Sequence, residues 1–218
     1  LAFDLADEYR NPVIILADGY IGQMMEPVDF PDPVQEVPAR PWSLEGETVP
    51  VNNLINSIYL VPDELEAHNH KLQAKYAVME EKETLNEEYR LDDAEYVIVG
   101  QGSVVRDAEA VADYLRENKR LKVGVLNLTM FRPFPSDLVA ALLAGKQGVV
   151  VLERTDQPLA VEQPLIREIR AALAQAVAQD PVLAHRIQRE RLPLDLVWLT
   201  RYYALRSHAK RQGLQFLG

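Results

Sequence analysis

Runs of apolar residues alternate with amphipathic stretches through residues 92–179 of the 218-residue chain. Three of the apolar runs have the length and composition of strands: residues 95–100, 123–128 and 149–152. Helices are expected after the turn at 101–103, over 137–144 and from Pro164. Strands that alternate with helices through short connections are typical of a mostly parallel sheet with helices on both faces. We therefore predict an α/β domain here.

The spacing of apolar residues also predicts which side of the first helix faces the sheet. These residues recur at three- and four-residue steps: Val104, Ala108, Val111, Ala112 and Leu115. For the next helix, Ser136 is the expected N-cap, because a serine oxygen can accept a hydrogen bond from the first turn. Gly145 or Gly148 is expected to end that helix, since glycine readily adopts the left-handed conformation found there.

The first 30 residues contain an amphipathic stretch followed by a continuous apolar run. Leu1, Leu5 and Tyr9 share one helical face. Residues 11–17, Asn-Pro-Val-Ile-Ile-Leu-Ala, are typical of a strand that is covered on both faces and has neighbouring strands. Those neighbours do not precede it in this sequence. We therefore expect residues 1–30 to be the incomplete end of a second α/β domain.

Proline-rich sequence follows, and then a predicted helix. Proline fixes φ and removes backbone donors, so residues 31–63 are expected to be an extended linker, anchored by the apolar piece at 54–60. In the helix, an apolar stripe is formed by Leu65, His68, Leu72, Tyr76 and Met79. His68 and His70 lie on different helical faces, which favours packing roles over a metal site.

We expect residues 64–180 to form the α/β domain with its leading helix and residues 181–218 to form a C-terminal extension. The extension is basic in an otherwise acidic chain, and it also carries apolar residues such as Leu194, Leu196 and Trp198. It fits either a helical extension packed on its own domain or a docking arm for an acidic partner surface.

Composition excludes several classes of function. The net charge of −10 argues against nucleic acid or an anionic membrane as a partner. The chain has no cysteine, which excludes disulfides, thiolate nucleophiles, Cys-ligated zinc and iron–sulfur clusters held by this chain. No apolar stretch approaches the roughly 20 residues that span a bilayer, and no signal peptide is visible. We predict a cytoplasmic location.

One glycine-containing turn is a candidate for ligand binding. Gly100-Gln101-Gly102 follows a predicted strand and precedes a helix, as at the start of a dinucleotide-binding fingerprint, but the third glycine is missing. Gly100, Gly102 and Ser103 are the candidate cofactor-binding residues, and a tight turn alone also explains the glycines. Polar residues 153–157 follow the third strand, at the edge where ligands usually lie, or they form a local salt bridge. No catalytic or metal-binding residue is assigned.

Several motifs, in order, resemble the alpha subunit of the 2-oxoacid:ferredoxin (flavodoxin) oxidoreductases. Asp18-Gly19-x-x-Gly22-Gln23-Met24-Met25-Glu26-Pro27-Val28 resembles the end of that subunit's pyrimidine-type domain. Further resemblance lies in residues 68–76, 88–95, 99–103 and in Arg132-Pro133-Phe134-Pro135. The resemblance covers residues 1–30 and 64–180, and it implies that the second domain is transketolase C-terminal-like. Its expected interface or domain-edge residues are Asp18, Gly19, Gly22, Gln23, Glu26 and Arg132.

The resemblance implies a role in thiamine-dependent oxidative decarboxylation of a 2-oxoacid, such as pyruvate or 2-oxoglutarate, to an acyl-coenzyme A. Thiamine diphosphate, magnesium and iron–sulfur clusters would then lie on the rest of the complex, with none bound by this chain alone. Expected partners are the beta (thiamine-binding) and gamma subunits, with ferredoxin or flavodoxin reached through the complex; a homodimer is also compatible. The family residues that grip the thiamine ring and the 2-oxoacid belong to an earlier segment, outside this sequence.

On this basis the chain is expected to give structure and subunit assembly, and to be inactive when isolated. Two alternatives stay open. The chain could be a non-catalytic module that binds an anionic ligand, coenzyme A or a nucleotide, at the turn of residues 100–103. It could also be a piece of another thiamine enzyme, a transketolase or a 2-oxoacid dehydrogenase. The motif at 18–28 favours the ferredoxin-linked family.

Overall fold

The computed structural model describes residues 1–30, 32, 40–43, 53, 55–155 and 157–179. The chain divides into two compact units, Leu1–Lys75 and Tyr76–Gly218, each described by itself. Much of the expected linker at 31–63 and the extension at 181–218 lie outside the described residues. Within the described part, no helix is both long and apolar enough to cross a membrane.

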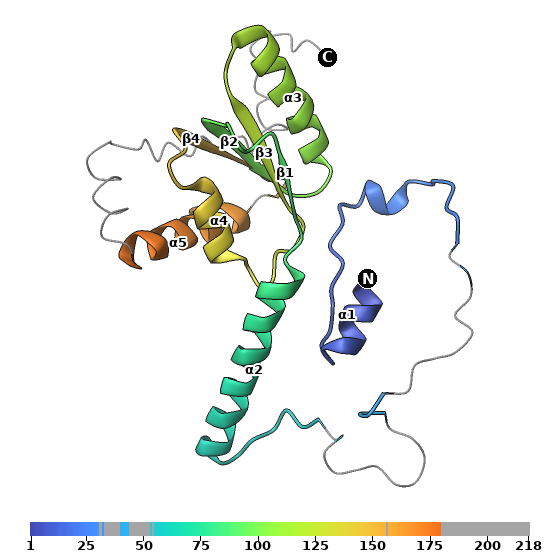
Figure 1. The fold of residues 1–218 in the computed structure, drawn as a ribbon. Coiled ribbons are helices and arrows are strands. Elements are labelled where there is room, and N and C mark those ends of the chain that lie inside the picture. Colours follow the sequence, from blue (N-terminus) through green and yellow to red (C-terminus); the bar gives the residue numbers. More distant parts are fainter. Residues whose placement is uncertain (31, 33–39, 44–52, 54, 156, 180–218) are drawn as a thin grey trace. The chain divides into compact units, whose positions relative to one another are not determined.

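The second unit is built on one four-stranded sheet with the order β1-β3-β2-β4 (Figure 1). Its strands are β1 (Asn86–Tyr89), β2 (Tyr96–Gly100), β3 (Val123–Leu128) and β4 (Gly148–Leu152). Strand β2 pairs in parallel with both β3 and β4, whereas β1 runs antiparallel to β3. The mostly parallel α/β sheet predicted from the apolar runs is confirmed.

Helices cover both faces of this sheet, as predicted. Helix α3 (Val104–Lys119) lies on one face, where it packs against Val123 and Val125 of β3. Helices α4 (Ser136–Leu143) and α5 (Pro164–Gln179) lie on the other face, where Leu126 and Leu128 are buried (Figure 1). Alternate residues of β3 therefore enter two separate cores, which explains why the strand is apolar throughout.

Strand β1 was not predicted. Its sequence, Asn-Glu-Glu-Tyr, has no apolar run, and its two glutamates are exposed. The strand exists because its backbone pairs with β3, from Asn86 opposite Leu128 to Tyr89 opposite Val125. Backbone pairing with an existing strand does not require an apolar side-chain pattern. The periodicity of apolar residues therefore could not predict this edge strand.

Two details of the helices differ from the predictions. Val111 of α3 is 48% exposed, because the buried stripe runs through Val105, Ala108 and Ala112 and turns Val111 outward. Ser136 is not an N-cap: it is the first residue of α4, the cap position belongs to Pro135, and no side-chain cap is formed. Gly145 follows the helix with φ of +75°, and Gly148 begins β4.

In the first unit, α1 (Ala2–Glu8) confirms the predicted amphipathic helix. The strand expected over residues 11–17 is not formed: Ile14, Ile15 and Leu16 are 78%, 75% and 79% exposed. A strand requires a hydrogen-bonding neighbour, and all four described strands belong to the second unit.

In the described part of the anchor expected at residues 54–60, Tyr59 packs on α2, whereas the aliphatic residues do not. Ile55, Ile58 and Leu60 are 64%, 69% and 90% exposed, so they bury little surface. The next helix, α2 (Pro62–Glu83), confirms the prediction and runs through the boundary of the two units. His68 stacks on Tyr59 with ring centroids 4.5 Å apart, a packing role as expected.

Candidate functional site

The candidate turn lies between the end of β2 and the start of α3. Gly102 has φ of +70°, a conformation that glycine adopts without strain. A Cβ on Gly100 would meet Val105 Cγ2 at 3.3 Å and Val104 Cγ1 at 3.5 Å, so the helix packs closely on the strand end. The local backbone and packing therefore explain why glycine occupies both positions. The ligand-binding role of Gly100, Gly102 and Ser103 stays a prediction.

The polar residues Glu153 and Arg154, which follow β4, contact two different parts of the domain. Arg154 donates a hydrogen bond from Nη1 to Ser103 Oγ at 3.2 Å, so these two predicted groups meet at the carboxyl edge of the sheet. Glu153 instead accepts hydrogen bonds from the backbone N–H groups of Leu165 (2.8 Å) and Ile166 (3.1 Å). Its carboxylate therefore caps the N-terminus of α5, where negative charge is favourable.

The capping position also affects the proton affinity of Glu153. Burial raises the pKa of its carboxyl above the usual value, while the two backbone hydrogen bonds and the Arg167 charge lower it. Burial is the largest of these effects, so the net pKa is raised. The carboxyl is held by the helix, and a local salt bridge does not describe its main contacts.

We expect Glu153→Gln to flatten the pH dependence of stability just above pH 4.5. Because the folded-state pKa of Glu153 is raised, the folded state holds its proton more tightly than the unfolded state. The free energy of unfolding of the unsubstituted chain should therefore fall as pH rises from the unfolded pKa through the folded pKa. Denaturant titrations at stepped pH measure this slope. Glu168→Gln, which removes the half-buried carboxylate that pairs with Arg132, is the control and should retain this slope.

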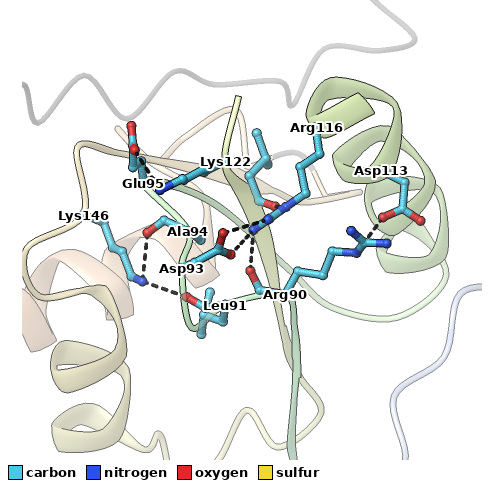
Figure 2. Close-up of polar contacts among 10 residues, drawn as sticks. Arg90, Leu91, Asp93, Ala94, Glu95, Asp113, Arg116, Lys122 and Lys146 are labelled. Atoms are coloured by element: carbon cyan, nitrogen blue, oxygen red, sulfur yellow. Dashed lines mark hydrogen bonds and ion pairs between the residues drawn. The ribbon is translucent and has the colours of Figure 1, made fainter. Parts of the chain in front are cut away.

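The opposite edge of the sheet carries a dense polar network around residues 90–95, between β1 and β2 (Figure 2). Arg116 of α3 donates to the carbonyl oxygens of Val123 (2.6 Å) and Arg90 (2.8 Å). Its two terminal nitrogens also contact both carboxylate oxygens of Asp93, at 3.2 and 2.7 Å. A single guanidinium thus ties the 90–95 segment to both α3 and β3.

Lys146 and Arg90 complete this network (Figure 2). Lys146 Nζ donates to the carbonyl oxygens of Leu91 (2.9 Å) and Ala94 (3.0 Å). Arg90, with φ of 50°, pairs through Nε with Asp113 Oδ1 at 2.9 Å. These cations bind carbonyl and carboxylate oxygens of their own domain. We call this network the clamp, because it holds residues 90–95 against the rest of the domain. Charge and spacing in the sequence did not single out Arg116 or Lys146.

The predicted interface residues lie in separate units. In the first unit, Asp18 Oδ1 accepts hydrogen bonds from the N–H groups of Tyr20 (3.0 Å) and Ile21 (2.9 Å), which forms a tight turn. Added Cβ atoms on Gly19 and Gly22 would meet nothing within 4 Å. The other two members of this motif, Gln23 and Glu26, are exposed. An interface role for these residues stays a prediction.

Arg132, in the second unit, makes contacts within its own domain. Its Nη2 pairs with Glu168 Oε1 at 2.7 Å, and its guanidinium lies 4.3 Å from the centre of the Phe131 ring. The side chain is still 58% exposed, so one surface of it is available to a partner. Among the described residues, no group of three or more His, Cys, Asp or Glu side chains could hold a metal ion.

Comparison with known proteins points to one enzyme family. Residues 94–190 match the family model described as pyruvate:ferredoxin oxidoreductase core domain II. The ketoisovalerate oxidoreductase subunit VorB of Methanothermobacter marburgensis is 46% identical over 145 residues, which cover 66% of this chain and 41% of the relative. The pyruvate synthase subunit PorA of Thermotoga maritima is 31% identical over 205 residues, 82% of this chain and 50% of the relative.

A third relative extends the range of substrates named in this group. The 2-oxoglutarate synthase subunit KorA of Methanocaldococcus jannaschii is 31% identical over 177 residues, which cover 70% of this chain and 47% of the relative. This chain therefore spans half or less of the length of these curated relatives. Their names share the chemistry of 2-oxoacids, as the resemblance of the motifs implied.

Proposed function

We infer that this chain, an alpha-subunit-like portion of a 2-oxoacid:ferredoxin oxidoreductase, contributes structure and subunit assembly to that enzyme and holds no complete active site. The reaction of the assembled enzyme would be thiamine-dependent oxidative decarboxylation of a 2-oxoacid to an acyl-coenzyme A. Thiamine diphosphate, magnesium and iron–sulfur clusters would be held by the other parts of the complex. The relatives named for three different 2-oxoacids support this reaction class without selecting one substrate.

The observation that carries the assembly role is the exposed apolar run at residues 13–16. Val13 is 41% exposed, and the three residues that follow are 75–79% exposed. Burying a side chain of this kind stabilises a complex by about 1.5–3 kcal/mol. Four consecutive aliphatic residues on a surface therefore form an exposed apolar strip, a feature that is typical of protein interfaces. The neighbouring motif of Asp18 to Glu26 would continue that interface.

The described chemistry of the second unit supports a structural role. The cations of the clamp, Arg90, Arg116 and Lys146, bind groups of their own domain. Glu153 is engaged by the start of α5. These side chains are thus committed to holding the fold, which leaves them poorly placed to move protons on a substrate.

Reconstitution with the partner subunits tests this proposal. We expect 2-oxoacid-dependent reduction of a viologen dye only when this chain is present, and no activity from the chain alone. Ile15→Asp should weaken assembly, because it places a charge in the apolar strip. Val111→Asp, an exposed apolar residue on α3, is the matched control and should assemble normally.

Three outcomes would contradict the proposal or the part of it that concerns residues 13–16. Dye reduction that does not depend on this chain would remove its role in the complex. Calorimetric detection of micromolar thiamine diphosphate binding by the isolated chain would show that it carries a cofactor site after all. If the Ile15→Asp and Val111→Asp variants assemble equally well, residues 13–16 are not part of the interface.

A further inference from the structure

The C-terminal turn of α1 is bound by segments of the first unit that are distant in the sequence. Arg10 donates a hydrogen bond from Nη2 to the Asn53 carbonyl oxygen at 2.9 Å, and its guanidinium lies 5.1 Å from the centre of the Trp42 ring. Arg40 pairs through Nε with Asp7 Oδ2 at 2.5 Å. These described parts of the expected linker are therefore held against α1.

Asn53 also organises the linker segment that meets this turn. Its Nδ2 donates hydrogen bonds to the carbonyl oxygens of Pro41 and Ser43, both at 3.2 Å. The Ser43 N–H donates to the Arg40 carbonyl oxygen at 3.0 Å, so residues 40–43 form a closed turn. One amide side chain thus holds this turn, while the carbonyl oxygen of the same residue binds α1. The contact between linker and helix therefore has a defined geometry.

Lys75 of α2 reaches the same end of α1. Its Nζ donates to Asn11 Oδ1 at 2.9 Å and to the Tyr9 carbonyl oxygen at 3.4 Å. The last carbonyl groups of a helix lack partners within it, so an ammonium group is favourable at this position. The Asn11 side chain also donates from Nδ2 to the Pro12 carbonyl oxygen at 3.0 Å. Asn11 therefore connects α2 to the peptide that leads into the apolar strip at residues 13–16.

The apolar strip begins two residues after Asn11. It pairs with no strand of the described part of the chain, and its side chains are exposed, so packing within the first unit does not fix its direction. Pro12 has its φ fixed by the ring, and Arg10 adopts φ of 45°. A segment that is ordered before it meets its partner binds more tightly, because less conformational entropy is lost on binding. Contacts at the end of α1 can therefore strengthen assembly without touching the partner.

We propose that residues 7–11, which we call the joint, order the apolar strip for docking on a partner subunit. Arg10 holds the linker to the joint, and Lys75 with Asn11 holds the point where the strip begins. All three are positioning residues, since they act on the interface through the backbone of the strip. The inference rests on the proposed assembly role of residues 13–16 and names the residues that set the strength of that interface.

Backbone NMR relaxation of the full chain measures the ordering directly. We expect the amide order parameters of Val13 and Ile14 to lie above about 0.6 and to fall below that value in Lys75→Met. Lys75→Arg keeps a donor at this position and should restore the order, which a role of side-chain volume alone would not predict. Lys71→Met is the matched control, because it removes the same charge from an exposed position one turn earlier on α2. The control should leave both order parameters unchanged.

Tryptophan fluorescence tests the contact between the joint and the linker. Trp42 is one of two tryptophans, so Trp198→Phe makes it the only one. In that background we expect Arg10→Met to increase acrylamide quenching of Trp42 about twofold, because the guanidinium no longer covers the ring. Arg106→Met, which removes an exposed arginine of the second unit, is the control and should leave the quenching unchanged.

Titration of the chain with its partner subunits connects the ordering to the interface. We expect Lys75→Met to raise the Kd of the complex about tenfold, because the strip must then be ordered on binding. Lys75→Arg should stay close to the unsubstituted chain. Asn11→Ala removes the same hydrogen bond from the other side and should match Lys75→Met. It decides the result if Lys75→Met unfolds α2, and the double variant should show no further loss.

Several outcomes would overturn the proposal. Unchanged order parameters in both Lys75→Met and Asn11→Ala would mean that the joint does not order the strip. Unchanged quenching in Arg10→Met would remove the contact with the linker. Failure of the joint is distinguishable from failure of the proposed function. If the strip is no interface, Ile15→Asp and Lys75→Met both assemble normally; if only the joint is wrong, Ile15→Asp alone impairs assembly.

Discussion

Replacing Gly124 with alanine is expected to destabilise the second unit by about 3 kcal/mol, at the upper end of the cost of overpacking. Gly124 lies in β3, where an added Cβ would approach the Arg90 carbonyl oxygen to 2.7 Å and the Ala94 Cβ to 2.9 Å. It would also lie 3.0 Å from the Leu91 Cα. Two of these three atoms are backbone atoms held by Arg116 and Lys146, so they cannot move aside cheaply.

Denaturant unfolding of the full chain measures this effect. Gly148→Ala in β4 is the matched control, because its added Cβ meets only the Tyr96 ring, at 3.1 Å for the nearest atom. The control should cost clearly less, since a side chain can shift where backbone cannot. Alanine is at least as good as glycine in an unconstrained strand. A Gly124→Ala variant as stable as the unsubstituted chain would therefore contradict the close approach of the 90–95 segment to β3.

The second large effect is expected at Arg116. Arg116→Met keeps an unbranched apolar stem but removes the guanidinium and its hydrogen bonds to the carbonyl oxygens of Arg90 and Val123 and to Asp93. The side chain is only 15% exposed, so water replaces these contacts poorly. We expect a loss of about 1–3 kcal/mol in the free energy of unfolding, chiefly because the partly buried carbonyl oxygen of Val123 is left without its donor.

A matched substitution separates this loss from the general effect of removing a positive charge. Arg106 also lies on α3 and pairs with Glu109 at 2.9 Å, but its side chain is 77% exposed. Arg106→Met should therefore shift the denaturation midpoint clearly less than Arg116→Met, because the Arg106 guanidinium is largely in water although its partner Glu109 is only 14% exposed. Equal effects of the two substitutions would mean that the clamp around residues 90–95 does not stabilise the domain.

The Arg116 substitution should also change the acid limb of the stability curve. Hydrogen bonding from Arg116 lowers the pKa of Asp93 in the folded state. A lowered carboxyl pKa adds stability above the unfolded pKa, and this stability is lost as pH falls through the folded pKa. Arg116→Met removes that contribution, so its stability should depend less on pH below about pH 4. An unchanged acid slope would show that another group controls it.

The sequence by itself determined the strands and helices that the pattern of their own apolar residues identifies as buried. The runs at 95–100, 123–128 and 149–152 are apolar at consecutive positions because a strand between two helical layers buries both of its faces. Pro164 at the start of α5 and the turn glycine Gly102 were similarly readable, because each matches a local backbone requirement. The motifs likewise sufficed for the family, since residues 94–190 match its model.

Only the tertiary structure decided the features that depend on contacts between distant segments. Strand β1 exists through backbone pairing with β3, and the apolar run at 13–16 is not a strand because no described neighbour pairs with it. The clamp joins Arg116 and Lys146 to residues 90–95, across sequence separations that no local pattern encodes. Local patterns report which surfaces a segment can bury. Which segment supplies the covering atoms depends on the path of the whole chain, and that is why these features became visible only in three dimensions.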